Sequence, residues 1–326
     1  MTTNTDIDIH QAIRDAARDY PRASQFTGQL MDRAKNLLAN HADHLIRTHG
    51  EVFWKQAERL LSIAEAMKGT TEEPGDSGEP IDSLIEYTYA YLKEQIRFMQ
   101  TKEYSHSDFE DVFKEVYDNP EVMDRFYLEG LMLTHAYWPI HFDIHKFFMD
   151  AFIPRVPDAG VGLEFGFGHG LYLLEVLEHR PRTITKSLDV SRFSIDYAGK
   201  LLAASGVAAD RYELGFGDAR KAWPQEDGSL SWGIFAEIIE HVPDPLYSLK
   251  ELCRCLAPGA PMFATTVVNS NAIDHLYLFT QTQQVNDMLQ EAGFQIVAEK
   301  HFRVADYGIH SQDPSIDVAY VCVPAG

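Results

Sequence analysis

The sequence has little positive charge and little cysteine. Its 326 residues include 28 Lys and Arg against 49 Asp and Glu, a formal net charge of −21. This charge repels nucleic-acid phosphates and anionic lipids, so we do not expect nucleic acid as a partner and favour a small molecule. The three cysteines, two of them in "LCRCL", fit neither a disulfide framework nor a paired zinc site, which suits a cytoplasmic protein.

Long apolar runs are also lacking. No stretch approaches the about 18 uninterrupted apolar residues of a membrane-spanning helix, so we expect no membrane partner. The first residues, "MTTNTDIDIH", have neither the basic nor the apolar segment of a signal peptide. Hydrophobic residues make up 45% of the chain, which is enough for one large core or two domains.

Two kinds of sequence pattern divide the chain. In residues 1–154 apolar residues recur at helical spacing, as at Ile85, Tyr89 and Leu92, and an acidic Gly- and Pro-rich segment at 68–80 predicts a loop. In residues 155–326 short β-branched or aromatic runs alternate with helical segments, which indicates a mostly parallel sheet. The sequence therefore predicts an α/β fold, a Rossmann-like sheet with helices on both faces, preceded by an all-helical N-terminal domain.

A glycine-rich segment, "LEFGFGHG", follows the first predicted strand. Glycines at 166, 168 and 170 would let backbone amides approach a ligand at the start of a helix. The dinucleotide fingerprint G-x-G-x-x-G would need a glycine at position 171, which is Leu171, so a nicotinamide enzyme is disfavoured. The pattern here is E-x-G-x-G-x-G, and it begins at Glu164.

Acidic residues end the next two predicted strands. In a parallel sheet, ligands lie off the carboxyl ends of the strands. A carboxylate at Asp189 can accept hydrogen bonds from both hydroxyls of a ribose, and one at Asp218 is suitably placed for an adenine amino group. The segments "EIIEHVPDP" and "LAPGAPMFATT" then follow in order.

With these motifs, residues 155–300 resemble a class I S-adenosylmethionine-dependent methyltransferase. The resemblance implies that Glu164 and the three glycines hold the methionine part of S-adenosylmethionine, whose ammonium a carboxylate complements. It also implies that Asp189 binds the ribose and Asp218 the adenine. The implied cofactor-binding residues are Glu164, Gly166, Gly168, Gly170, Asp189, Val190, Asp218, Ala219 and Glu237.

The segment "EIIEH" is a candidate metal site. Glu237, Glu240 and His241 have the spacing that one helical turn would bring to one face, and His275 follows the fifth strand. Two carboxylates and two imidazoles could bind a divalent metal such as Mg, Mn or Fe. The set resembles that of metal-dependent methyltransferases acting on small-RNA 3′-terminal ribose and of ubiquinone-pathway O-methyltransferases, which implies a metal that holds vicinal oxygens of the acceptor.

The same segment has a plainer interpretation. It is also the ordinary turn after the fourth strand, with Asp244 and Pro245 as the N-cap and first residue of the next helix. Without a metal, His241 or His275 is the candidate general base, because an imidazole titrates near neutrality. Asp274 would then either orient an imidazole or simply end a turn.

A second cluster, "LTHAYWPIHFDIHKFF", precedes the first strand. Its candidate substrate-binding residues surround Pro139 and are His135, Tyr137, Trp138 and His141. The alternative is the packed face of a helix beside a proline kink.

These observations predict methyl transfer from S-adenosylmethionine to a small organic acceptor in specialised metabolism, with oxygen favoured as the methylated atom and carbon or nitrogen kept as alternatives. A non-methylating reaction such as a cyclisation, RNA 2′-O-methylation and a non-catalytic scaffold stay as alternatives. The helical domain would form the roof of the acceptor pocket, the contact of a homodimer, or both.

Overall fold

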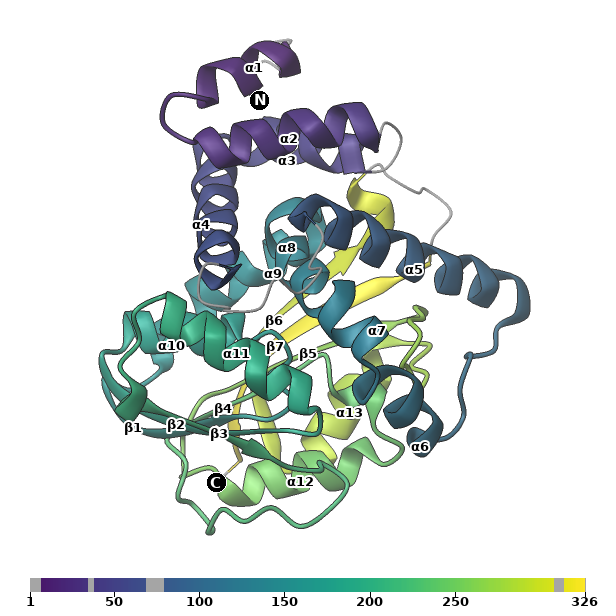
Figure 1. Cartoon of the computed structure of the whole chain (residues 1–326). Helices are drawn as coiled ribbons and strands as arrows, with labels where there is room; N and C mark the ends of the chain where they lie inside the picture. The colour runs from purple at the N-terminus through teal and green to yellow at the C-terminus, as the bar shows by residue number, and fades with distance from the viewer. Residues whose placement is uncertain (1–6, 35–37, 69–78, 308–313, 326) are drawn as a thin grey trace.

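A seven-stranded sheet forms the centre of the C-terminal half. The computed structural model describes residues 7–34, 38–68, 79–307 and 314–325, so most of the loop predicted at 68–80 lies outside it. The strand order is β3-β2-β1-β4-β5-β7-β6 (Figure 1). The strands are β1 Ala159–Glu164, β2 Arg182–Asp189, β3 Tyr212–Phe216, β4 Trp232–Ala236, β5 Met262–Val268, β6 Phe294–Arg303 and β7 Ile316–Pro324.

The pairing of the strands determines where the sheet can bind a ligand. Strands β1 to β5 pair in parallel, and β7 is antiparallel to both β5 and β6. Because β1 pairs with β2 on one side and with β4 on the other, the strand order reverses at β1. That reversal opens a crevice at the carboxyl ends of β1 and β4, where ligands bind in such folds.

Helices cover both faces of the sheet, as predicted. Side chains of α12 and α13 pack on one face, and those of α9 and α10 pack on the other (Figure 1). Successive residues of β4 alternate between these faces: Phe235 joins the α12 side, whereas Trp232 and Ile234 join the α9 side. The helices are α10 Leu171–His179, α11 Arg192–Ala204, α12 Pro245–Cys255 and α13 Thr282–Glu291.

The first half of the described chain is helical. Two π-helical turns, at Phe113–Tyr117 and Met123–Tyr127, interrupt it before α8. The helices are α1 Ile9–Ala16, α2 Pro21–Arg33, α3 Leu38–His49, α4 Glu51–Lys68, α5 Pro80–Thr101, α6 Phe109–Val112, α7 Pro120–Val122, α8 Leu128–Tyr137 and α9 Pro139–Phe147.

The helical half shares its core with the sheet half. Leu30 and Leu60 from the first helices belong to the same apolar cluster as Leu174 of α10 and Leu201 of α11. Next to this cluster Arg59 of α4 binds the carboxylates of Glu175 and Glu178 on α10, at 2.5 and 2.8 Å. The division predicted at residue 155 precedes β1, but burial is continuous across it.

An aspartate side chain caps the start of two helices, α12 and α6. Asp244 is the N-cap of α12, with its carboxylate 3.1 Å from the Tyr247 amide and Pro245 at the first position, as the plainer interpretation of "EHVPDP" expects. At α6 the cap is Asp108, whose side chain accepts a hydrogen bond from the Glu110 amide.

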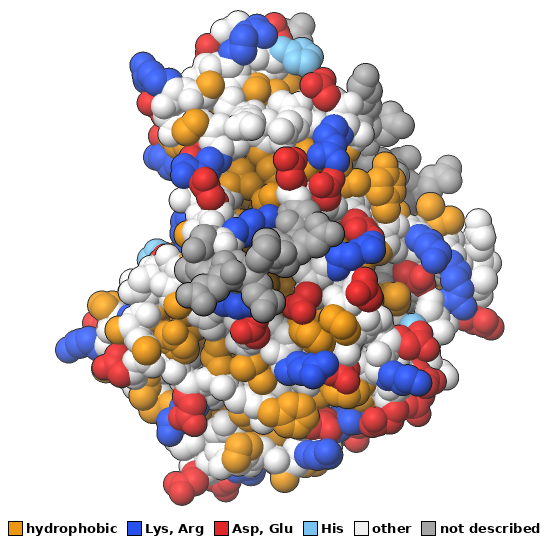
Figure 2. Space-filling view, in the orientation of Figure 1, with side chains coloured by type: hydrophobic (Ala, Val, Ile, Leu, Met, Phe, Trp, Pro, Cys, Tyr) orange, Lys and Arg blue, Asp and Glu red, His pale blue; other side chains and the backbone are white. Residues whose placement is uncertain are grey.

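The surface mixes charges of both signs. On the face shown in Figure 2, Lys and Arg side chains lie among Asp and Glu side chains. Several of these make ion pairs, such as that between Arg22 and Glu58 at 3.1 Å. In the described part of the chain, no helix has the length and apolar character needed to cross a bilayer.

Candidate active site

A cavity of about 240 Å³ lies at the carboxyl ends of β1, β2, β3 and β4. Its lower wall comes from the sheet loops, and its upper wall comes from α5, the segment 109–127, α8 and α9. Residues predicted to bind cofactor and residues predicted to bind substrate therefore line one connected space. Eight of the nine predicted cofactor residues line it; the exception is Gly170, which packs behind the loop.

The glycine loop has a backbone that requires glycine. Gly166 has φ 68°, and a Cβ there would lie 2.1 Å from the Ile238 side chain. Gly168 has φ 51°, and a Cβ there would meet nothing within 4 Å. Because Gly168 also lines the cavity, its backbone is open to a ligand. The loop ends at the start of α10, where backbone N–H groups have no helical partner.

One carboxyl oxygen of Glu164 is left without a partner. Its carboxyl group is buried, and its Oε2 atom has no hydrogen-bond partner in the described structure. Burial, followed by the nearby Asp189 carboxylate, raises the pKa of Glu164 well above its usual value. A cationic group of a ligand would supply the missing partner, so this residue fits the ammonium of S-adenosylmethionine.

Asp189 has a second role within the protein itself. Its two carboxylate oxygens accept hydrogen bonds from the Gly168 amide at 3.0 Å and the Ser191 amide at 2.8 Å. Burial raises its pKa to about 6 despite these bonds. Asp189 therefore shapes the glycine loop and at the same time lines the cavity.

Asp218 is already engaged by basic side chains. Arg220 binds its oxygens through Nε and Nη2, both at 2.9 Å, and the guanidinium also lies 3.8 Å from the centre of the Phe109 ring. Arg220 forms another ion pair with Glu110 of α6. The predicted adenine end of the site is thus closed by a segment of the helical half, which the sequence did not indicate.

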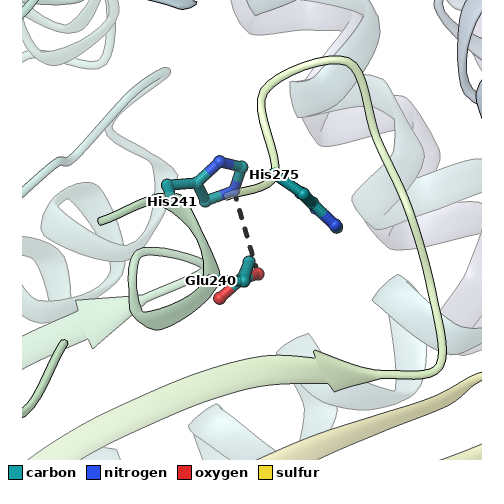
Figure 3. A group of neighbouring side chains, drawn as sticks. All are labelled: Glu240, His241 and His275. Atoms are coloured by element: carbon teal, nitrogen blue, oxygen red, sulfur yellow. Dashed lines mark ion pairs between the residues drawn. The ribbon is translucent and has the colours of Figure 1, made fainter. Parts of the chain in front are cut away.

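The predicted metal ligands come together from the ends of β4 and β5. Glu240, His241 and His275 each place one ligand atom within 4.8 Å of the others (Figure 3). The predicted helical turn is a 3-10 turn at Ile239–His241, and Glu237 precedes it with φ 53°. The expected shared helix face is therefore absent, and Glu237 lies outside this group of three.

The lone pairs of this group fit a cation. The Nδ1 atoms of His241 and His275 lie 3.0 and 3.4 Å from the carbonyl oxygens of Asp274 and Ser270, so each Nδ1 donates a proton and each Nε2 keeps its lone pair. Glu240 Oε1 is buried without a hydrogen-bond partner in the described structure. Burial and then the Glu237 carboxylate raise the pKa of Glu240 well above its usual value, and a bound cation would relieve both effects.

Asp274 lies behind His241 and is held by two tyrosines. Its Oδ2 atom accepts hydrogen bonds from Tyr117 at 3.1 Å and Tyr127 at 2.8 Å, and it is 3.5 Å from His241 Nδ1. The sequence left open whether Asp274 orients an imidazole or only ends a turn. In the structure its carboxylate faces the imidazole of His241. The two tyrosines were missed, because nothing in a helical segment indicates contact with a loop so far away in sequence.

The second predicted cluster divides between cavity and core. His135, Trp138 and His141 line the cavity, and the Trp138 indole donates to Thr88 at 3.2 Å. Tyr137 does not line it: the side chain is fully buried and its ring packs 4.8 Å from Phe26. Neighbouring residues of a helix point in different directions, so Tyr137 belongs to the core of the helical half.

Comparisons with known proteins identify a methyltransferase domain in the sheet half. A family described as "Methyltransferase domain" matches residues 163–264, which include the glycine loop, the acids after β2 and β3, and Glu240 and His241. A ubiquinone biosynthesis O-methyltransferase of Pseudomonas savastanoi pv. phaseolicola is 25% identical over 194 residues, 57% of this chain and 80% of that protein. One from Ralstonia nicotianae is 28% identical over 165 residues, 48% of this chain and 66% of that protein.

Solved structures give a weaker likeness. The [4+2]-cyclase SpnF has a TM-score of 0.46 and 19% identity, over 54% of this chain and 80% of that one. A sarcosine dimethylglycine methyltransferase, described as putative, from Galdieria sulphuraria has a TM-score of 0.46 and 12% identity, over 57% and 85%. Neither likeness bears on the reaction catalysed here. The matched domain, the sheet and the chemistry of its crevice together make this chain an S-adenosylmethionine-dependent methyltransferase.

Proposed function

We propose that the protein methylates a hydroxyl of a small organic acceptor, with a divalent metal held by Glu240, His241 and His275. The observation that carries the proposal is that two members of this group, His241 and His275, line a cavity that the cofactor acids also line, with Glu240 close beside them. The ubiquinone-pathway relatives, which are named as O-methyltransferases, support the choice of oxygen. We place this methyl transfer in specialised metabolism, as we expect from the sequence.

The residues of the sheet half bind the cofactor. Glu164 receives the ammonium, the glycine loop approaches the methionine part, Asp189 accepts the ribose hydroxyls, and the cavity wall at Val190, Asp218 and Ala219 receives the adenine. When bound, S-adenosylmethionine supplies an electrophilic methyl group on a sulfonium. What the protein adds is alignment of the acceptor with that methyl, an orientation effect worth several kcal/mol.

The group at the end of β4 makes the acceptor oxygen reactive. A divalent metal bound there would lower the pKa of an acceptor hydroxyl, and His ligands with Nε2 lone pairs suit Mn, Fe or similar ions. Asp274, held by its two tyrosines, contacts Nδ1 of the cavity-lining His241, whose Nε2 lies 3.8 Å from Glu240. The same orientation would let His241 accept the proton of the hydroxyl directly if no metal is used.

The helical half encloses the acceptor. Aromatic rings from α5 and the segment 109–127 line the upper wall, among them Tyr91, Phe109 and Tyr117. These rings form an apolar wall that keeps water from the methyl group, and they favour an acceptor with an aromatic or otherwise apolar body.

The test is metal content together with cofactor affinity. The protein is purified without chelator, its metal content is measured, and the dissociation constant of S-adenosylmethionine is determined by calorimetry. We expect near-stoichiometric metal that is lost in His241→Ala and His275→Ala, whereas cofactor affinity stays within a few-fold.

A matched control is available on α10. Glu175, Glu178 and His179 form another group with ligand atoms within 4.8 Å, but Arg59 already binds both carboxylates. His179→Ala should therefore leave the metal content unchanged. Cofactor binding without any metal, even after Mg, Mn or Fe is added, would reject the metal and leave His241 as the base. No cofactor binding would reject the whole proposal.

A further inference from the structure

Three imidazoles meet in the upper part of the cavity, away from the group at β4. His135 of α8, His141 of α9 and His169 of the glycine loop all line the cavity. The ring centre of His135 lies 5.5 Å from that of His141 and 5.0 Å from that of His169. His169 was not singled out in the sequence, although it stands inside "GFGHG".

Hydrogen bonds fix the proton of the His141 ring. The Thr134 hydroxyl donates to the Leu131 carbonyl at 2.5 Å, so its oxygen can only accept from the ring of His141 at 2.7 Å. The proton of His141 therefore lies on Nδ1. Its Nε2 atom carries a lone pair and has no hydrogen-bond partner among the described residues.

The other two rings are fixed in the same way. His135 Nδ1 lies 3.2 Å from the Leu131 carbonyl oxygen and must donate to it, which leaves a second Nε2 lone pair. His169 Nδ1 instead accepts from the Leu171 amide at 3.1 Å, so this ring carries its proton on Nε2. The three rings thus offer two acceptors and one donor.

The rings stay neutral, and they do not form a metal site. Burial lowers the pKa of His141 to about 4, and burial followed by His141 lowers that of His169 to about 3. Among the described residues, the groups whose ligand atoms lie within 4.8 Å of one another include none of these three histidines. The complementary ligand is therefore an uncharged organic group with hydrogens to donate.

We propose that His135, His141 and His169 form a recognition subsite for an uncharged polar group of the acceptor that both donates and accepts hydrogen bonds, such as a hydroxyl or a primary carboxamide. This inference rests on the proposed function, because it assigns the acceptor to this cavity. The group recognised is distinct from the oxygen that is methylated, which lies at the group formed by Glu240, His241 and His275.

Benzamide and acetophenone test the subsite without knowledge of the acceptor. The two molecules have nearly the same shape and no charge, but only benzamide has N–H donors. Their dissociation constants are measured by ligand-observed NMR on the full chain with chelator and S-adenosylhomocysteine present. We expect benzamide to bind about tenfold more tightly, because acetophenone leaves the lone pairs of His135 and His141 unpaired.

Asparagine substitutions separate the two nitrogens of each ring. In His135→Asn and His141→Asn, the amide nitrogen of asparagine keeps the contact made by Nδ1, but the Nε2 acceptor is lost. The two probes should then bind each variant with nearly equal dissociation constants. His179→Asn is the matched control, since His179 Nδ1 also bonds a backbone carbonyl four residues earlier, at 2.9 Å, and the ring does not line the cavity. This variant should keep the preference.

The outcomes are decisive in both directions. Absence of benzamide binding up to its solubility limit, equal binding of the two probes, or a preference that survives both Asn variants would each overturn the subsite. Long-range ¹H–¹⁵N spectra that place the proton of His135 or His141 on Nε2 would also overturn the subsite. Calorimetry of S-adenosylhomocysteine on the same samples tests the proposed function separately. If S-adenosylhomocysteine does not bind, the proposed function fails, while the probe binding and the tautomers of the histidines still test the subsite.

Discussion

The cavity has two walls that differ in chemistry and in origin. The wall from the sheet half carries carboxyl groups, and Glu164 and Glu237 each keep an oxygen without a partner in the described structure. The wall from the helical half carries aromatic rings and imidazoles whose pKa values burial lowers, such as His141 at about 4. A cationic cofactor needs negative charge, whereas an organic acceptor needs apolar surface and a few neutral polar atoms. The difference fits our proposal that the sheet half binds the cofactor and activates the acceptor oxygen, whereas the helical half encloses the body of the acceptor.

The largest expected effect concerns the carboxylates of the sheet wall. Glu164→Gln and Asp189→Asn should each weaken S-adenosylmethionine binding about a hundredfold, because each removes a charge-assisted contact. Asparagine is preferred to alanine at 189, since its amide oxygen still accepts from one of the Gly168 and Ser191 amides, whereas alanine leaves both unpaired. Calorimetry measures the affinity, with Asp196→Asn, on the outer side of α11, as control. Unchanged affinity in both variants would remove the cofactor from this wall.

The contact between the two halves should come next. Arg59→Met removes the arginine from the buried Glu175 carboxylate, which keeps the imidazoles of His145 at 2.9 Å and His179 at 3.7 Å as neighbours. Because the arginine is partly exposed, we expect a loss of about 2 kcal/mol in the free energy of unfolding, less than for a fully buried pair. Urea unfolding measures the loss, and Arg18→Met, in an exposed pair, is the control. Equal effects of the two substitutions would show that the halves do not depend on this contact.

A smaller effect should appear in the pH dependence of cofactor binding. The pKa of Glu164 is raised by burial and by Asp189, so the free protein holds a proton on it that a cationic ligand must displace. Cofactor affinity should therefore rise with pH through this pKa, by up to about tenfold per unit, and then level off. Calorimetry in buffers of different ionisation enthalpy measures the released proton. The release should be smaller in Glu164→Gln, and equal release in that variant would assign the proton to another group.

The smallest expected effect concerns the tyrosines behind Asp274. Tyr117→Phe or Tyr127→Phe removes one hydrogen bond to the buried carboxylate, with an expected loss of about 1 kcal/mol in unfolding free energy. The pKa of both hydroxyls is raised well above the usual value, by burial and then Asp274, so both stay donors at neutral pH. Tyr89→Phe, on the exposed face of α5, is the control. Wild-type stability in both variants would show that the Asp274 carboxylate does not need these bonds.

Much of the fold could be predicted from the sequence. Alternation of strands and helices predicted the sheet, and the fold class is confirmed by the seven strands and the helices on both faces. The glycine loop could be found because its conformations exclude other residues, and Asp244 with Pro245 because a helix start is a local structure. The prediction that Glu237 lies in a helical turn was wrong. Glu237 follows β4 with a left-handed backbone conformation, and the 3-10 turn begins only at Ile239.

The sequence by itself determined the cofactor wall. Residues at the carboxyl ends of consecutive parallel strands must lie at one edge, so Glu164, Asp189 and Asp218 could be grouped without any coordinates. Only the tertiary structure decided the other wall, because contacts such as those of Tyr117 and Tyr127 with Asp274 join segments distant in the chain. It also decided that Tyr137 faces the core while His135 and His141 face the cavity, since the direction of a helical side chain depends on what packs around the helix.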